Sequence, residues 1–367
     1  MKRVADLAQL SGFFLALAYK EHVKPNLHVR PLVAELFLTE NCNLRCVSCA
    51  CWRTNTKDEL TTAEWADVLE QLARERIYKV NFTGGEPLMR RDAVELMRRA
   101  TEIGIRHLHL NSNAILLTPQ RIAEVLDAGV RSFNISVDGT RETHDLIRGR
   151  DGSFDTTVRH LRVLAEQGRG LGVRIRMNFT VMRDNVTVLP EVARLAQELG
   201  VRLYLNLATD RTFLFVHEQV TEQASVRDRE LAEALETLEK LARRDSRHLP
   251  RYSDLRYIPK HFSDVLQGDL PCAESQLKLM IHSRGEIGGC WGHAPGMSVR
   301  DRRIHDVIAS PEYRAEHEKL FRKECVGCGS NYSLNLRWRP RTYVEDMLWR
   351  RGRRSLLDEL TPTGQHG

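Results

Sequence analysis

Short apolar runs alternate with longer amphipathic stretches from residue 33 onward. The runs are rich in β-branched and aromatic residues and predict strands at 33–38, 79–82, 107–110, 132–137, 174–181 and 203–207. Between them, apolar residues recur at helical spacing, often after a capping Thr or Asp and before a Gly. These stretches predict helices at 62–77, 91–104, 118–130, 154–168 and 189–201. This order is typical of a parallel sheet wrapped by helices.

About six such units predict an α/β fold, an open, partial (β/α)6 TIM-type barrel with its site at the C-terminal ends of the strands. The style of the sequence changes after Asp210, where a charged helix at 226–245 precedes a Pro- and Tyr-containing connection. We therefore predict a domain boundary near residue 250. The expected units are an N-terminal helical extension (1–30), the barrel (31–250), a small C-terminal α+β domain (251–335) and a basic helix and tail (336–367).

The composition is that of an ordinary globular protein, with 367 residues, 42% apolar and 28% charged. Eight unevenly placed cysteines do not form a disulfide scaffold, which favours a reducing cytoplasm. The opening Lys2 and Arg3 with an apolar stretch imitate a signal peptide, but Asp6 and Gln9 interrupt it. A short amphipathic helix is the better interpretation. No segment approaches the roughly 18 apolar residues of a membrane span.

The net charge of +6 is mild, but the C-terminal tail is locally basic. Seven arginines lie there among aromatic residues: Arg337, Arg339, Arg341, Arg350, Arg351, Arg353 and Arg354, with Trp338, Tyr343 and Trp349. A solvated terminal helix is favoured over a patch for an anionic substrate group, and both over nucleic-acid binding. Neither a nucleic acid nor a membrane is expected as a partner.

Three cysteines crowd the loop after the first predicted strand. Cys42, Cys46 and Cys49 have Cys-x3-Cys-x2-Cys spacing. Three thiolates hold three corners of an iron-sulfur cubane and leave one iron open, whereas structural zinc ordinarily takes four protein ligands. The spacing therefore favours an iron-sulfur cluster or a catalytic metal.

Together with "NFTGGEPLMRRD" after the second strand, this loop resembles that of radical S-adenosylmethionine (SAM) enzymes. The resemblance implies a [4Fe-4S] cluster on the three cysteines, with SAM at its open iron. Gly84 and Gly85 would let the backbone approach a ligand closely, and Glu86 would meet the methionine ammonium group of SAM. The alternative is a zinc-binding loop beside an unrelated turn.

The segment "SVDGTRETHDLIRG" resembles the subgroup that carries extra clusters in a C-terminal extension. The resemblance implies that Ser136 and Arg148 contact the carboxylate and ribose of SAM, and a guanidinium suits a carboxylate. Asn111 and Asn113 are expected in the nucleoside pocket, with turn formation as the alternative. The neighbouring Asp138, His144 and Asp145 could equally be turn and cap residues. The sequence departs from the family pattern at Ser48, the position before the third cysteine, where an aromatic residue near the adenine is common. Trp52 is a candidate to replace that aromatic side chain.

A second group of cysteines consists of Cys272, Cys290, Cys325 and Cys328. Their spacing resembles a SPASM-type extension in its shortened, twitch-like form. The resemblance implies a second, auxiliary [4Fe-4S] cluster with four cysteine ligands. A zinc site with the same four ligands is the alternative. Cys51 is left over; it is either a small buried apolar residue or a hydrogen-atom donor to a substrate radical.

The resemblance implies an enzyme that accepts electrons from a partner such as flavodoxin or ferredoxin and splits SAM into methionine and a 5′-deoxyadenosyl radical. The substrate radical is then either oxidised or epimerised. Because the first strand begins near residue 33, without room for a leader-recognition domain, we expect a small hydroxyl-rich substrate such as a sugar, aminocyclitol or glycosylated natural product. Strand-end candidates for its contacts are Arg176, Asn178, Asn206 and Asp210. The alternatives are modification of a ribosomally made peptide and, in another class, a zinc-binding structural or regulatory protein.

Overall fold

The computed structural model describes residues 2–49, 51–54, 56–208, 226–262, 271–290, 296–324 and 339–351. Within these residues, no helix is both long and apolar enough to cross a membrane. Cys325, Cys328 and Asp210 lie outside the described residues, as does the tail beyond Arg351.

In the described residues, nine strands form one sheet, in the order β6-β5-β4-β3-β2-β1-β7-β8-β9. The first six strands are parallel neighbours in chain order, which confirms the predicted partial barrel. Each predicted strand is present, with its ends within two residues of the prediction. The observed strands are β1 Val33–Phe37, β2 Lys79–Thr83, β3 His107–Ser112, β4 Ser132–Ser136, β5 Arg174–Val181 and β6 Arg202–Leu207.

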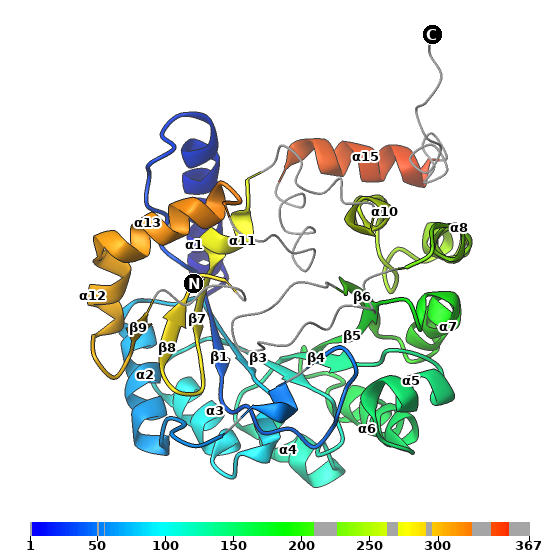
Figure 1. Cartoon of the computed structure of the whole chain (residues 1–367), viewed down its shortest axis with the longest axis horizontal. Coiled ribbons are helices and arrows are strands. Elements are labelled where there is room, and N and C mark those ends of the chain that lie inside the picture. Colours follow the sequence, from blue (N-terminus) through cyan, green and yellow to red (C-terminus); the bar gives the residue numbers. More distant parts are fainter. Residues whose placement is uncertain are drawn as a thin grey trace.

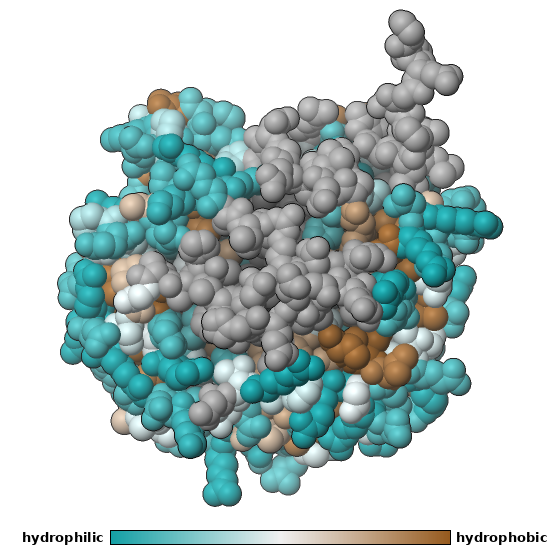
Figure 2. All heavy atoms as spheres, viewed as in Figure 1, coloured by the Kyte–Doolittle hydropathy of each residue, from teal (hydrophilic) through white to brown (hydrophobic). Residues whose placement is uncertain are grey.

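Helices pack along the outer, convex side of these strands (Figure 1). They are α2 Thr62–Arg74, α3 Ala93–Glu102, α4 Pro119–Asp127, α5 Arg141–Arg148, α6 Ser153–Gln167 and α7 Leu189–Glu198. The start of α2 shows why the chain turns into a helix there. The Thr61 hydroxyl accepts from the Glu64 amide, and the Glu64 carboxylate accepts from the Thr61 amide. The visible rim of the molecule is mainly hydrophilic (Figure 2), because such helices bury only one stripe.

Alternate residues of each strand point to opposite faces of the sheet. The residues facing the helices are apolar and buried, and they form the main core with residues such as Trp65 and Leu161. Phe82, Phe133 and Phe179 contribute to it from three strands and are fully inaccessible. The residues on the opposite, concave face are mostly polar.

The C-terminal strands extend the barrel sheet at its β1 edge. β7 Lys278–Ile281 pairs parallel with β1, and β8 Glu286–Gly288 and β9 Met297–Ser298 follow antiparallel. The domain boundary near residue 250 stays a prediction. The helices of this region are α11 Ala273–Leu277, α12 Ile304–Ala309 and α13 Pro311–Phe321.

The N-terminal segment forms the expected helix, α1 Lys2–His22. Phe13 and Leu17 of α1 pack against Ala273 and Phe321 in a second, smaller core. The Lys20 ammonium group is buried and donates to the carbonyls of Pro25 and Leu27. The extension is therefore part of the folded body.

Of the basic tail, the structure describes residues 339–351, in which α15 Pro340–Arg350 is buried on one side at Asp346 and Trp349 and exposed on the other at Tyr343 and Val344. Trp349 is fully buried, and its indole N–H donates to Glu239 at 2.7 Å. Asp346 accepts from the Ser253 amide at 2.9 Å. These contacts join α15 to α8 Asp228–Arg244 and α9 Tyr252–Leu255, and α10 Ile258–Phe262 lies beside α8. Trp349, one of the aromatic residues among the arginines, is therefore used for packing.

Candidate active site

The cysteine loop and the glycine motif are joined directly by their backbones. The Gly85 amide donates to the Thr39 carbonyl at 2.7 Å, and the Glu86 amide donates to the Asn41 carbonyl at 2.8 Å. Thr39 and Asn41 lie three positions and one position before Cys42. The two motifs, about 40 residues apart in sequence, therefore meet at the C-terminal ends of the neighbouring strands β1 and β2.

Gly84 and Gly85 are required by this junction. A Cβ at Gly84 would lie 2.3 Å from the Thr39 carbonyl oxygen, and Gly84 also has a positive φ of 134°. A Cβ at Gly85 would lie 2.3 Å from the Asn41 oxygen and 2.6 Å from that of Glu40. The structure shows that the glycines admit the backbone of the cysteine loop, and the expected close approach of a ligand stays a prediction.

The Glu86 side chain is fully buried and has protein partners. Its carboxylate accepts from the Ser112 hydroxyl at 2.9 Å, the Asn113 amide at 2.8 Å and the Leu88 amide at 3.3 Å. Burial raises its pKa to about 7. In this arrangement Glu86 ties the end of β2 to the end of β3. The contact of Glu86 with the ammonium group of SAM stays a prediction.

Asn113 connects the end of β3 to the cysteine loop. Its side-chain amide donates to Asn43 Oδ1 at 2.7 Å and lies 3.9 Å from the Cys42 sulfur. Its carbonyl accepts from Thr157 of α6 at 2.9 Å. Asn111 lies on β3, where its side-chain oxygen is 3.1 Å from His109 Nε2. The sequence pattern indicated Asn111 and Asn113 as candidate site residues. No sequence signal identified Asn43 and Thr157 as partners of Asn113, because both are far from Asn113 in the sequence.

The end of α5 holds the loop from another side. The Arg45 amide donates to the Arg148 carbonyl at 3.1 Å, and the Val47 amide to the Ile147 carbonyl at 2.9 Å. The Arg148 guanidinium makes an ion pair with Asp138 and lies 3.6 Å from the Cys46 sulfur. The predicted roles of Arg148 and of the half-buried Ser136 at the end of β4 in binding SAM are not tested by these contacts.

Of the residues weighed as turn or cap residues, Asp145 and His144 have structural contacts. Asp145 accepts from the Gly152 and Phe154 amides, both at 2.7 Å, at the start of α6. His144 Nδ1 accepts from the Asp138 amide at 3.1 Å. Asp138 also accepts from the Thr180 amide of β5 at 2.8 Å. Asp138 therefore orients Arg148 from a fixed position.

The three loop cysteines fit an iron-sulfur cluster in their chemistry. Burial raises the pKa of Cys42 to about 11 and raises that of Cys46, so their thiolates need a compensating positive charge such as a metal. Leu44 and Ile115 pack beside them and provide an apolar wall. In the described residues, no three His, Cys, Asp or Glu side chains converge on one ion. A cubane does not require this, because each cysteine binds a different iron.

Cys51 lies in η1 Cys51–Arg53, close to the third cysteine. A hydrogen bond with Cys51 lowers the pKa of Cys49 to about 7, and Cys51 also contacts Glu40. The Arg45 and Arg53 guanidiniums lie 5.1 and 4.7 Å from the centroid of the Trp52 ring. Whether Trp52 replaces the aromatic residue missing at Ser48 stays a prediction.

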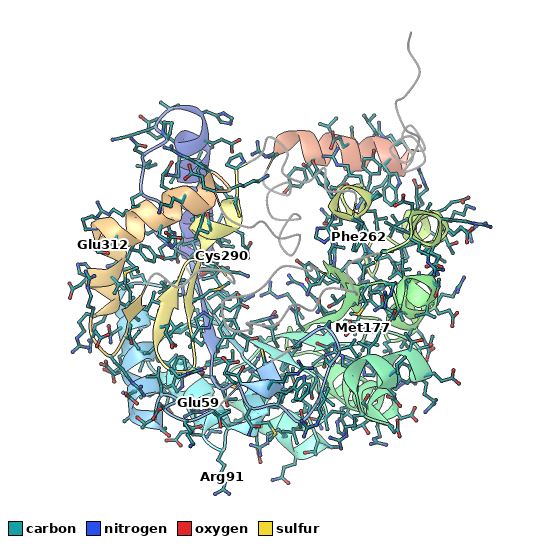
Figure 3. The ribbon with its side chains drawn as sticks, viewed as in Figure 1. Glu59, Arg91, Met177, Phe262, Cys290 and Glu312 are labelled. Atoms are coloured by element: carbon teal, nitrogen blue, oxygen red, sulfur yellow. The ribbon has the colours of Figure 1, made fainter. Side chains whose placement is uncertain are left out.

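Only two of the four C-terminal cysteines lie in the described residues. The Cys272 amide donates to the Phe321 carbonyl at 2.8 Å. Phe321 is four positions before Cys325 in the sequence. Cys290 lies at the end of the β8 ribbon (Figure 3), after Gly289. A Cβ at Gly289 would lie 2.3 Å from His317 Nε2 of α13. Cys272 and Gly289, which precedes Cys290, therefore both contact α13, while the auxiliary site as a whole stays a prediction.

Residues 36–183 match the family model of the radical SAM superfamily. The match runs from the end of β1 to the end of β5 and contains the cysteine loop, the glycine motif and α5. Residues 36–183 therefore form a radical SAM domain, a type of domain that implies a [4Fe-4S] cluster and SAM. The similarities below agree with the SPASM- and twitch-bearing subgroup indicated by the sequence.

Two relatives illustrate the range of similar proteins. The chain is 28% identical to an AdoMet-dependent heme synthase of Oleidesulfovibrio alaskensis over 298 residues, which are 75% of this chain and 74% of the relative. It is 37% identical to a PqqA peptide cyclase of Rhodopseudomonas palustris over 171 residues, which are 46% of this chain and 44% of the relative. The chain therefore spans less than half of that cyclase.

The fold is similar to that of Streptococcus suis SuiB in its complex with S-adenosylmethionine. The TM-score is 0.63 with 16% identity, over 87% of this chain and 74% of SuiB. At this identity the similarity supports the partial barrel fold and no finer conclusion.

Proposed function

We propose that this radical SAM enzyme cleaves SAM reductively and abstracts a hydrogen atom from a carbon of a peptide substrate. The observation that carries the first part is the backbone junction between the cysteine loop and the Gly84-Gly85-Glu86 motif. When bound, a [4Fe-4S] cluster supplies the electron that breaks a carbon–sulfur bond of SAM. The residues of the chain position the two reactants and limit access of water.

The proposed division of work among the residues follows from their positions. Cys42, Cys46 and Cys49 hold the cluster. Asn113 and Arg148 lie beside the sulfurs of Cys42 and Cys46 and provide N–H groups that stabilise thiolate charge. The fully buried Glu86 maintains the strand ends beneath them.

A peptide is favoured over the carbohydrate that the sequence analysis placed first. The support is the similarity to the PqqA peptide cyclase, at 37% identity over nearly half of this chain. The similarity to a heme synthase is a reason to test porphyrins as well. Dehydrogenation and epimerisation are both open outcomes, with Cys51 as the candidate hydrogen-atom donor for epimerisation.

An auxiliary cluster on Cys272, Cys290, Cys325 and Cys328 is the second part of the proposal. The Cys272 amide donates to the carbonyl of Phe321, the last residue of α13. Phe321 is four positions before Cys325 in the sequence, and this proximity supports the proposal. Zinc with four cysteine ligands is the alternative, and a metal assay separates the two. A reducing partner such as flavodoxin or ferredoxin would supply electrons.

The experiment is anaerobic reconstitution followed by iron, sulfide and zinc assays and an absorption spectrum. Two clusters predict about eight irons per chain, and one cluster with zinc predicts about four irons. Reduction with dithionite in the presence of SAM should yield 5′-deoxyadenosine, and Cys46→Ala should abolish it. A reconstituted protein that contains iron but does not cleave SAM would contradict the proposal.

Cys51→Ala tests the outcome for the substrate. If the substrate is epimerised, the variant should still form 5′-deoxyadenosine but should lose incorporation of solvent deuterium into the product. If the substrate is oxidised, product formation should change little. Mass spectrometry of the product in deuterated buffer separates the two outcomes.

A further inference from the structure

Two large apolar side chains are exposed beside the cysteine loop. Val47 of the loop is 44% exposed, and Leu146 of α5 is 69% exposed. The Val47 amide donates to the carbonyl of Ile147, the residue after Leu146, so the two exposed side chains belong to adjoining segments. A single exposed apolar residue is ordinary, but two on adjoining segments at a functional site favour a contact surface.

The cluster proposed on the loop lies behind Val47. The Arg45 and Val47 amides both donate to carbonyls at the end of α5, so they point to the same side, as in an extended segment. Exposure alternates in the same way, because Arg45 and Val47 are exposed and Cys46 between them is buried. A protein that contacts Val47 would therefore be separated from a cluster on Cys46 by one segment of the chain.

The charge of the loop is positive. Residues 41–56 contain two arginines, Arg45 and Arg53, and no acidic residue. The next two residues, Lys57 and Asp58, have opposite charges. Arg150, just after α5, is a further exposed cation, and Arg45 and Arg150 are both at the edge of the apolar pair.

The acids of this region belong to the α5 side. Asp138 makes an ion pair with Arg148, and Asp145 accepts from two backbone amides at the start of α6. Glu142 and Asp151 are exposed and lie in α5 and in the turn that follows it. Positive charge therefore predominates on the cysteine loop itself, next to the proposed cluster.

A redox protein is the partner that this position favours. Reductive cleavage of SAM takes an electron from outside the chain, so a donor protein has to come close to the cluster. Encounters between redox proteins use small interfaces, for which a short apolar centre is sufficient. A basic edge around that centre attracts a donor with an acidic surface and raises the rate of encounter.

We propose that Arg45, Val47, Leu146 and Arg150 form the docking surface for an acidic one-electron donor protein of the flavodoxin or ferredoxin class. This inference rests on the proposed reductive cleavage of SAM and identifies where its electron enters. The reduced donor loses one electron for each SAM consumed. The carbon–sulfur bond of SAM breaks, and the products are methionine and the 5′-deoxyadenosyl radical.

The test compares two reductants on the reconstituted full chain with SAM. One is flavodoxin, kept reduced by flavodoxin reductase and NADPH, and the other is dithionite, which needs no docking surface. In Leu146→Glu and in Arg150→Glu, the flavodoxin concentration that gives half the maximal rate of 5′-deoxyadenosine formation should rise about tenfold. The rate with dithionite should stay at the wild-type level.

Salt gives a second readout. The wild-type rate at low flavodoxin concentration should fall as the ionic strength rises, because salt screens the attraction between exposed charges. In Arg150→Glu this dependence should be weaker. A rate that is independent of salt in the wild type would overturn the electrostatic part of the proposal.

Two variants elsewhere on the surface are matched controls. Leu7→Glu changes a side chain that is 66% exposed on α1, and Arg314→Glu changes an exposed arginine on α13. Both helices lie on the opposite side of the molecule from α5 (Figure 1). Both variants should respond to flavodoxin and to dithionite as the wild type does, with an unchanged Tm.

Three results would overturn the proposal. They are an unchanged flavodoxin dependence in both α5-side variants, an equal loss of rate with dithionite, and the same effect in the controls. A wild type that cleaves SAM with dithionite but accepts electrons neither from flavodoxin nor from a ferredoxin would also overturn it.

The result can be distinguished from failure of the proposed function. Cleavage of SAM with dithionite and no dependence on this surface contradicts only the inference. No cleavage of SAM with dithionite contradicts the proposed function. In that case, calorimetric binding of flavodoxin still tests the surface, because Arg150→Glu should weaken it and Arg314→Glu should not.

Discussion

The two groups of cysteines are held by different parts of the fold. The loop with Cys42, Cys46 and Cys49 is fixed by hydrogen bonds from the ends of β2 and β3 and from the end of α5. The described C-terminal cysteines lie instead at the N-terminus of the short helix α11 and at the end of the short strand β8, where Cys272 and Gly289 contact α13.

This difference predicts how each proposed metal site would depend on its metal. The first loop is positioned by residues from several strands, so much of its shape is determined by the barrel itself. The second group connects short elements, and metal ligands that join such elements contribute directly to local folding. Changes at the barrel junction should therefore affect both stability and SAM cleavage. Changes at the second group should affect metal content and local stability more than SAM cleavage.

The largest effect is expected from Gly85→Ala. The new methyl group would meet the Asn41 and Glu40 carbonyl oxygens, which are backbone atoms that cannot move independently. We expect a loss of about 3 kcal/mol or more in unfolding free energy and loss of SAM cleavage. Urea unfolding and 5′-deoxyadenosine formation are the measurements.

The control for this substitution is Gly12→Ala. Gly12 lies in α1, and a methyl group added there would have no atom within 4 Å, so Ala should stabilise the helix by up to about 1 kcal/mol. If Gly85→Ala were as well tolerated as Gly12→Ala, the close junction of the two motifs would be incorrect.

The next largest effect concerns pH and Glu86. The pKa of this carboxyl is about 7 in the fold, whereas the ordinary pKa of a glutamate side chain is 4.5. Because the folded state binds the proton more tightly, its stabilising effect is complete below about pH 4.5 and is lost as the pH rises through about 7. In Glu86→Gln this change should be absent, so the stability difference between the two proteins should vary by about 3 kcal/mol between pH 4.5 and 8.5.

Urea unfolding of both proteins across this pH range is the measurement. Glu142→Gln, on the exposed side of α5, is the control and should leave the pH profile of the wild type unchanged. Parallel pH profiles for the wild type and Glu86→Gln would show that Glu86 does not titrate in this range.

A smaller effect on stability, but a clear one on chemistry, is expected from Arg148→Lys. Lysine retains the charge beside Asp138 but cannot contact Asp138 and the Cys46 sulfur with one planar group. We expect SAM cleavage to fall by about tenfold to a hundredfold, with iron content largely retained. Arg150→Lys, at an exposed position, should behave like the wild type.

The smallest effect on SAM cleavage is expected from Cys272→Ser. Iron content should fall to about half if the C-terminal cysteines hold a second cluster, while 5′-deoxyadenosine formation persists. Loss of zinc with unchanged iron would identify a zinc site instead. If cleavage of SAM were lost as completely as in Cys46→Ala, the two groups of cysteines would not be independent.

The sequence alone determined the elements of the barrel and the class of chemistry. Strands occur where expected because short runs rich in β-branched and aromatic residues favour strands, a property of each segment by itself. The cysteine spacing and the Gly-Gly-Glu-Pro motif are likewise local, so their resemblance to the radical SAM superfamily was visible without a fold.

Only the tertiary structure decided which partners these residues have. Gly84 and Gly85 accommodate Thr39 and Asn41, Glu86 binds Ser112, and β7 joins the barrel sheet beside β1. Each of these contacts joins residues that are distant in sequence. Such contacts depend on the order and register of strands, which packing of the whole chain determines and no local pattern encodes.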